Sequence, residues 1–85
     1  MPTVSLFYGI LIQIFPNDHN PPHFHAKYQG YSASFDFDGN LKEGNFPANK
    51  QKLVSAWAVL HKEDLEANWE LACAGLSCMK IEPLR

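Results

Sequence analysis

The fold of this chain is decided by residues 23–37, which read HFHAKYQGYSASFDF. Two runs in this stretch, 23–28 and 31–37, alternate apolar and polar residues, and only Gln29-Gly30 separates them. Such alternation is typical of strands with one buried face, and a two-residue loop that contains glycine predicts a tight hairpin. We therefore expect an antiparallel hairpin here.

The short loop also predicts which residues face each other across the hairpin. One face pairs Tyr28 with Tyr31, Ala26 with Ala33 and Phe24 with Phe35, and the other pairs Lys27 with Ser32, His25 with Ser34 and His23 with Asp36. A shift of one residue would mix apolar and polar side chains on both faces, so the pattern supports this register. It brings the His23 imidazole near the Asp36 carboxylate and places both histidines on one face.

Two further strands are expected outside the hairpin. The nearly continuous apolar run Leu6–Phe15 is typical of a strand buried on both faces. After the hairpin, Asp38-Gly39-Asn40 is taken as a three-residue loop, and a short strand follows it. That reading pairs Phe37 with Leu41 and Asp36 with Lys42.

The C-terminal half shows the spacing of helices. Pro47 suits a helix start, and Gly75 suits a helix end. Apolar residues follow at helical spacing, but the stripe changes phase between His61 and Asp64, which predicts two helices or one kinked helix. The expected core is Phe24, Phe35, Leu53, Trp57, Leu60, Leu65 and Trp69.

These elements predict a single α+β domain over residues 1–85. We expect a small antiparallel sheet of three to four strands with two C-terminal helices packed on one face. The helices should cover the face of Phe24, Ala26 and Phe35 and leave the histidine face open. The segment after Met79 should dock on this body.

Composition narrows the class of function. The chain has 85 residues and a formal net charge of −2, which does not favour strong non-specific binding to nucleic acid. Its two cysteines are too few for a disulfide scaffold, and no apolar run approaches the roughly 20 residues of a membrane span. We expect a cytoplasmic protein with no membrane partner and no cofactor.

The segment 18–25, DHNPPHFH, carries three of the four histidines. Imidazoles transfer protons near neutral pH, so one interpretation is metal-independent acid–base catalysis, for example RNA cleavage. The catalytic candidates are His23, His25, Asp36 and Lys27, and the substrate-binding candidates are His19, Ser34 and Lys42.

Two other interpretations of the histidines stay open. In the first they are structural and bond the backbone or Asp36 around the Pro21-Pro22 corner. In the second His23 and His25 bind a metal ion, with His19 or Asp18 as a third ligand. His-x-His alone is a weak metal signal, and we predict no metal site.

Several segments together resemble a known family. They are MPTV (1–4), FYGI (7–10), NDHNPPHFHA (17–26), WAVLH (57–61), NWELA (68–72) and KIEPL (80–84). The chain resembles the short bacterial proteins of domain of unknown function 4160 along nearly its whole length. Such proteins often appear encoded beside a second small protein, of the domain of unknown function 2442 type, in what looks like a toxin–antitoxin arrangement.

The resemblance implies the toxin-like member of such a two-gene module, and we expect it to act on RNA through His23 and His25. The alternatives are a non-catalytic module that docks the partner protein through its histidine face or an aromatic edge, and a histidine-based metal site. Candidate partners are the antitoxin-type protein of the neighbouring gene, RNA and a second copy of the chain.

Overall fold

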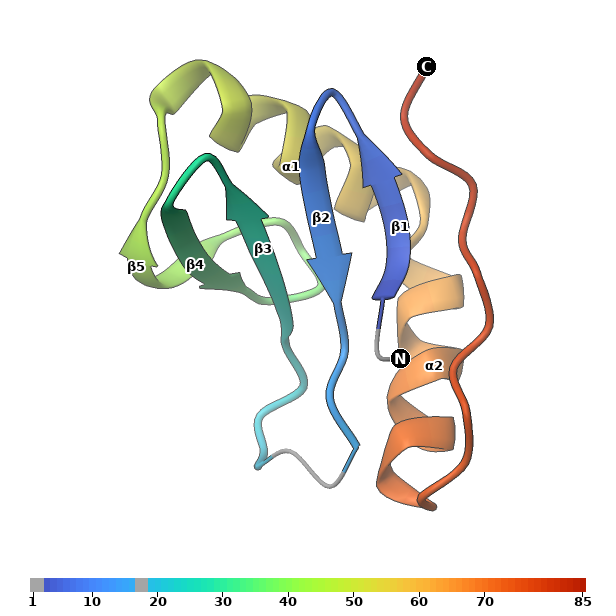
Figure 1. The fold of residues 1–85 in the computed structure, drawn as a ribbon. Coiled ribbons are helices and arrows are strands. Elements are labelled where there is room, and N and C mark those ends of the chain that lie inside the picture. Colours follow the sequence, from blue (N-terminus) through green and yellow to red (C-terminus); the bar gives the residue numbers. More distant parts are fainter. Residues whose placement is uncertain (1–2, 17–18) are drawn as a thin grey trace.

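Five strands in chain order form one antiparallel sheet, and two helices follow them (Figure 1). The computed structural model describes residues 3–16 and 19–85. The elements are β1 (Thr3–Phe7), β2 (Ile10–Gln13), β3 (Phe24–Tyr28), β4 (Tyr31–Phe35), β5 (Leu41–Asn45), α1 (Ala48–Leu60) and α2 (Lys62–Cys73). The predicted α+β architecture is confirmed, with five strands rather than three to four.

The β3–β4 hairpin has the predicted register. Tyr28 pairs with Tyr31, Ala26 with Ala33 and Phe24 with Phe35. Gln29 and Gly30 form the two-residue turn with φ angles of 44° and 86°, the left-handed geometry that such tight hairpins use. The alternation therefore separates an inner face, which packs on the helices, from an outer face that carries His25.

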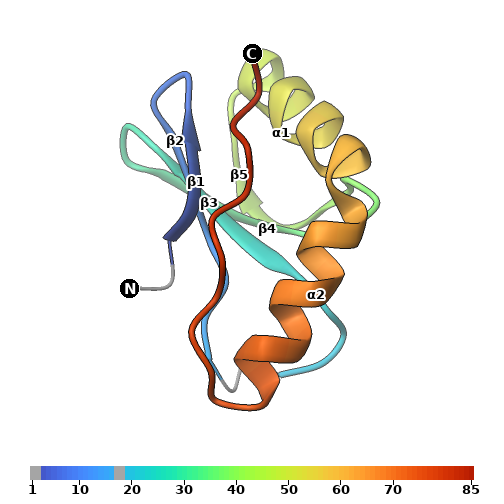
Figure 2. The same ribbon diagram turned by 90° about the vertical axis from the view of Figure 1, so that its right-hand side faces the viewer.

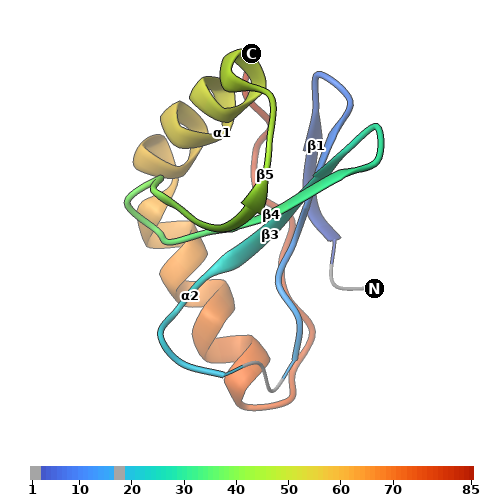
Figure 3. The same cartoon turned by 90° about the vertical axis from the view of Figure 1, so that its left-hand side faces the viewer.

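The single N-terminal strand that we expected is wrong, because the apolar run folds into the β1–β2 hairpin. Phe7 pairs with Ile10, and the turn is Tyr8-Gly9 with φ angles of 50° and 76°. Because the residues on both sides of Tyr8-Gly9 are mostly apolar, the sequence shows no change of pattern at the turn. The β1–β2 and β3–β4 hairpin tips lie beside each other (Figure 3), since a Cβ on Gly9 would lie 3.5 Å from the Tyr28 ring.

The predicted pairing of β4 with β5 is also wrong. Phe35, not Phe37, pairs with Leu41, and Ser34 pairs with Glu43. Lys42 is therefore an extra residue, and the strand bulges there. The cause is a longer turn over residues 36–40, in which the Asp36 amide donates a hydrogen bond to the Asn40 carbonyl at 3.0 Å.

Both helices lie on one side of the sheet (Figure 2). His61 separates α1 from α2, as the phase change predicted, and Pro47 directly precedes α1. Gly75 ends α2: its amide donates to the Ala72 carbonyl, and the next amide donates to the Leu71 carbonyl. In the described part of the chain, no helix has the length and apolar character needed to cross a membrane.

Most of the predicted core is confirmed. Phe24, Phe35, Trp57, Leu65 and Trp69 are buried, and Leu53 is partly buried. Leu60 was predicted wrongly, since 70% of it is exposed. The buried stripe of α1 runs through Val54, Trp57 and Ala58, and half-buried His61 continues it by packing its ring on Trp57 with centroids 5.6 Å apart.

The C-terminal segment docks on the body and runs between β1 and the helices (Figure 2). The Ile81 amide donates to the Val4 carbonyl at 2.8 Å, and the Trp57 indole N–H donates to the Glu82 carbonyl at 2.8 Å. The buried Asn68 side chain donates to the Met79 carbonyl and accepts from the Met79 amide, each at 2.8 Å. These bonds satisfy polar groups that would otherwise be buried without partners.

Candidate functional site

Three imidazoles lie in a row where the chain enters β3. His19 lies in the loop after β2, His23 directly precedes β3, and His25 is the second residue of that strand. The His19 and His23 ring centroids are 5.0 Å apart, and those of His23 and His25 are also 5.0 Å apart. His23 is therefore the centre of a histidine cluster.

His23 is held from two sides. Its Nδ1 lies 2.8 Å from the Pro21 carbonyl oxygen, and its ring lies 5.4 Å from that of Trp69 on α2. A carbonyl only accepts, so Nδ1 donates this hydrogen bond, and in the neutral ring the lone pair is on Nε2. The expectation of a fully open histidine face is wrong here, because His23 precedes the paired residues of β3 and its ring turns toward α2, leaving 8% exposed.

His25 belongs to the outer face of the sheet. It is half-buried, and its ring contacts the edge of Phe15 with centroids 4.8 Å apart. The strand pairings place it in a row that runs across the sheet from Gln13 through His25 and Ser34 to Glu43. This row connects the cluster to β5.

The cluster forms one wall of a pocket of about 530 Å³. That wall consists of His19, Pro21, Pro22, His23 and His25, and the rest is lined by Ser32, Ala33, Ser34, Asp36, Lys42, Glu43 and Gly44. Its volume falls within the usual range for small-molecule sites. The pocket combines imidazoles, both signs of charge and hydroxyl groups.

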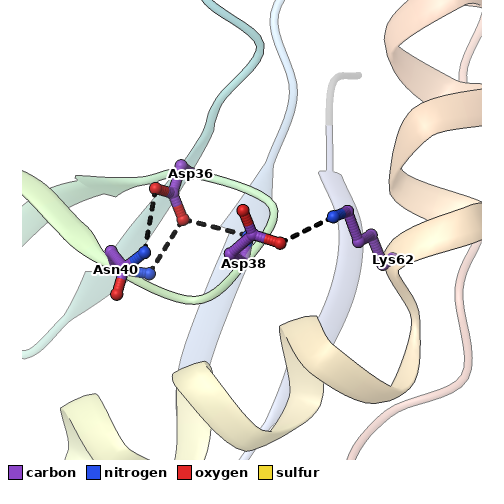
Figure 4. Close-up of polar contacts among 4 residues, drawn as sticks. All are labelled: Asp36, Asp38, Asn40 and Lys62. Atoms are coloured by element: carbon purple, nitrogen blue, oxygen red, sulfur yellow. Dashed lines mark hydrogen bonds and ion pairs between the residues drawn. The ribbon is translucent and has the colours of Figure 1, made fainter.

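Asp36 organises the turn beside the pocket (Figure 4). One carboxylate oxygen accepts from the amides of Asp38 and Asn40 at 2.9 Å each, and the other accepts from the Asn40 side chain at 3.1 Å. Lys62 of α2 binds Asp38 at 2.6 Å, and Ser55 of α1 donates to the Gly39 carbonyl at 2.6 Å. Both helices therefore hold this turn in place.

The electrostatics of Asp36 follow from these bonds. Partial burial on its own would raise the pKa of the carboxyl, but the hydrogen bonds from Asn40 and Asp38 outweigh it. The positive charge of Lys42 acts in the same direction, so the pKa of Asp36 is held below its usual value. Asp36 is an ionised turn residue at the pocket rather than a group poised to exchange a proton.

The structure brings together most of the residues that the sequence singled out. His19, His23, His25, Ser34, Asp36 and Lys42 all line the pocket. The β3–β4 ladder ends at Phe24 and Phe35, one residue short of the predicted pair His23 and Asp36. Lys27 lies on the outer face of β3, outside the residues that line the pocket, and Asp18 lies outside the described residues.

Sequence reasoning missed Glu43 as a pocket residue. The predicted register, with Asp36 opposite Lys42, would place Gly44 opposite Ser34. The bulge at Lys42 shifts the register, so that Glu43 pairs with Ser34 and continues the row of His25 and Ser34. Bulges occur often beside active sites, where they redirect a side chain. The exposed charged pair Lys42-Glu43 was a visible signal, but only the register places both residues at the pocket.

Within residues 3–16 and 19–85, no three His, Cys, Asp or Glu side chains are placed to hold a metal ion. The two cysteines, Cys73 and Cys78, are free thiols. Burial raises the pKa of the Cys78 thiol, which makes it a weak nucleophile.

The fold and pocket define the class: a small α+β domain whose five-stranded sheet carries a histidine-lined pocket beside its outer face. Residues 9–70 match the family described as Domain of unknown function (DUF4160). The chain belongs to this family. No curated protein and no solved structure matches the chain.

Proposed function

We propose that this chain is the toxin-like member of a two-gene bacterial module and that it cleaves RNA without a metal ion. The observation that supports the proposal is the row of three imidazoles, 5.0 Å from ring to ring, along a pocket that also holds Lys42. Histidines need little tuning to transfer protons near neutral pH. The proposed location is the cytoplasm, where RNA is the substrate.

The proposed reaction is an internal transfer of the phosphodiester. His23 accepts the proton of the ribose 2′-hydroxyl at Nε2, and the 2′-oxygen bonds to phosphorus. The bond from phosphorus to the 5′-oxygen breaks, and the His25 imidazolium gives that oxygen a proton. The products are a 2′,3′-cyclic phosphate and a 5′-hydroxyl, and proton exchange with water restores the two imidazoles.

The remaining groups have supporting roles. The Lys42 ammonium stabilises the charge that builds on the phosphate oxygens, which is the kind of term that dominates many enzymes. His19 and Ser34 line the pocket and contact the substrate. With a formal net charge of −2, affinity for RNA depends on local cations, of which Lys27 on the same sheet face is one.

The experiment is controlled expression in a bacterial host, alone and together with the neighbouring gene, with growth and RNA integrity as readouts. We expect expression alone to stop growth and to fragment RNA, and we expect the partner to restore growth. His23→Ala and His25→Ala should each abolish the effect, since a general acid or base contributes about 10²–10⁴-fold. His61→Gln, outside the pocket, is the matched control.

A second candidate is a non-catalytic module that docks the neighbouring-gene protein or a second copy of the chain. Leu6, Tyr8 and Tyr31 support it, because about half or more of each is exposed and the two tyrosines lie at adjacent hairpin tips. If the wild type is harmless and RNA stays whole, nuclease action is excluded. Loss of partner binding by Tyr8→Ser and Tyr31→Ser would then identify docking as the function.

A further inference from the structure

Glu43 faces the histidine cluster from the far side of the pocket. It pairs with Ser34, which pairs with His25, so the two titratable side chains lie two strands apart on one face. Neighbouring strands are separated by about 4.8 Å, which puts the two backbones roughly 10 Å apart. Ser34 lies between His25 and Glu43, and its short side chain leaves room for a ligand above this part of the sheet.

The pocket floor next to Glu43 consists of small residues. Ser32 and Ser34 have short side chains, and Gly44 has none. A Cβ on Gly44 would overlap the Ser32 carbonyl oxygen and lie 2.9 Å from the Ala33 Cα, and the φ of Gly44 is 89°, so only glycine suits this position. Gly44 therefore lets β5 approach the β4 backbone closely, and the short side chains of Ser32 and Ser34 leave the surface beside Glu43 open to a flat ring such as a nucleobase.

Charge is distributed unevenly over the pocket. Lys42, the extra residue of the bulge, acts electrostatically on Asp36, which lies one residue beyond the end of β4. Lys42 and any protonated histidine supply the positive charge of the pocket, and they suit a phosphate provided that it lies away from the ionised Asp36 carboxylate, which is held in its own turn by Asn40 and Asp38. The carboxylate of Glu43, next to Lys42 on β5, cannot bind a phosphate and needs hydrogen-bond donors.

We propose that Glu43 recognises guanine, so that the pocket takes a guanine nucleotide with its 3′-phosphate at His23 and His25. An ionised carboxylate only accepts hydrogen bonds, and its two oxygens suit two parallel donors. On its Watson–Crick edge guanine presents N1–H and the exocyclic amino group side by side. On the same edge the other RNA bases offer a single donor beside an acceptor. Sequence-specific proteins read RNA through unpaired bases on this edge, so the substrate is single-stranded.

The inference rests on the proposed RNA cleavage, and the test separates the two. The substrates are three DNA oligonucleotides, each with one ribonucleotide, which is G, A or U. The wild type should cleave after G with a kcat/KM about 10- to 100-fold above that for A or U, the discrimination that a good bidentate contact provides. Glu43→Gln should lose this preference, so that its kcat/KM for the G substrate falls to about its own value for the A and U substrates.

Glu63→Gln, on the exposed face of α2 away from the pocket, is the matched control and should keep the preference. An equal loss on all three substrates would overturn the inference, because a proton-transfer group acts whatever the base. Cleavage by the wild type without preference for G would overturn it too, and the proposed ribonuclease activity would stand.

Binding tests the inference even if no oligonucleotide is cleaved. Calorimetry of the whole protein should show that guanosine 3′-monophosphate binds at least 10-fold more tightly than adenosine 3′-monophosphate, and Glu43→Gln should remove the difference. If this holds without cleavage, the ribonuclease proposal fails and the guanine site stands. If the two nucleotides bind equally, or neither binds, the guanine site is overturned.

Discussion

The His23 imidazole lies against the Trp69 indole, with ring centroids 5.4 Å apart, although the two residues are far apart in the chain. The Phe37 ring contacts the same indole at 6.2 Å, so Trp69 joins the core to the pocket. Substitutions in α2 should therefore affect the histidine cluster without touching the sheet.

Trp69→Leu should change the environment of His23 more than that of His61. The ring current of the indole acts on the His23 ring protons, so their NMR shifts should move when the indole is lost. His61 packs on Trp57 instead and should keep its shifts. Unchanged His23 shifts would mean that the ring contact does not persist in solution.

Trp57→Ala should lower the free energy of unfolding by roughly 3–5 kcal/mol, because Trp57 is fully buried in the core. Trp57→Phe should cost less: it keeps most of the apolar contact and loses the indole bond to the Glu82 carbonyl, worth about 1 kcal/mol. Chemical denaturation measures both. A cost for Trp57→Ala below about 1 kcal/mol would contradict the burial.

The part of the fold that the sequence predicts well depends on local signals. Gln29-Gly30 lies between two alternating runs, and only one register keeps both faces uniform. Tyr8-Gly9 also ends in glycine, but the runs before and after it are mostly apolar. Neither run alternates apolar and polar residues, so the sequence does not indicate a turn there. The buried stripe of α1 was predicted to include Leu60. In the structure half-buried His61, one residue further on, packs on Trp57, and Leu60 is exposed.

The site was harder to predict than the fold. The three histidines lie close together in the sequence, within residues 19–25, so sequence reasoning reached the cluster. The contribution of β5 depends on one extra residue, Lys42, and no pattern in a five-residue strand marks a bulge. The contact of His23 with Trp69 depends on how α2 packs, which periodicity does not determine.

Stability should fall in acid because of Asp36. The pKa of Asp36 is lower in the folded protein than in the unfolded chain, so the ionised carboxylate stabilises the fold. This stabilisation is complete above the unfolded-state pKa, near 4, and is lost as the pH falls through the folded-state pKa. Asp36→Asn should lower the Tm at pH 7 but much less at pH 2.5. Glu70→Gln, an exposed change on α2, is the control and should have the same small effect on the Tm at both pH values. A constant Tm difference for Asp36→Asn would contradict the linkage.

Zinc should not bind tightly to the histidine cluster. Three imidazoles would suffice for a catalytic zinc site, but within residues 3–16 and 19–85 no three His, Cys, Asp or Glu side chains are placed to hold a metal ion. Calorimetric titration of the purified protein with zinc measures this directly. One equivalent bound with a submicromolar Kd, lost in His25→Ala, would favour the metal site over acid–base catalysis.

Lys27 and Lys42 should differ in what they contribute to RNA cleavage. Lys27 lies on the outer face of the sheet beside the pocket, so Lys27→Ala should weaken the binding of single-stranded RNA and reduce the salt dependence of binding by about one phosphate contact, with kcat unchanged. Lys42 lines the pocket, so Lys42→Ala should lower kcat as the developing phosphate charge loses its cation.

Fluorescence anisotropy over a range of salt concentrations measures the binding, and a single-site oligonucleotide measures kcat. Lys52→Ala, an exposed change on α1, is the control and should alter neither quantity. The two lysines are on one face and close to the same substrate, so a simple loss of charge would weaken binding equally in both variants. That result, with kcat unaffected in each, would show that Lys42 attracts RNA and takes no part in the chemical step.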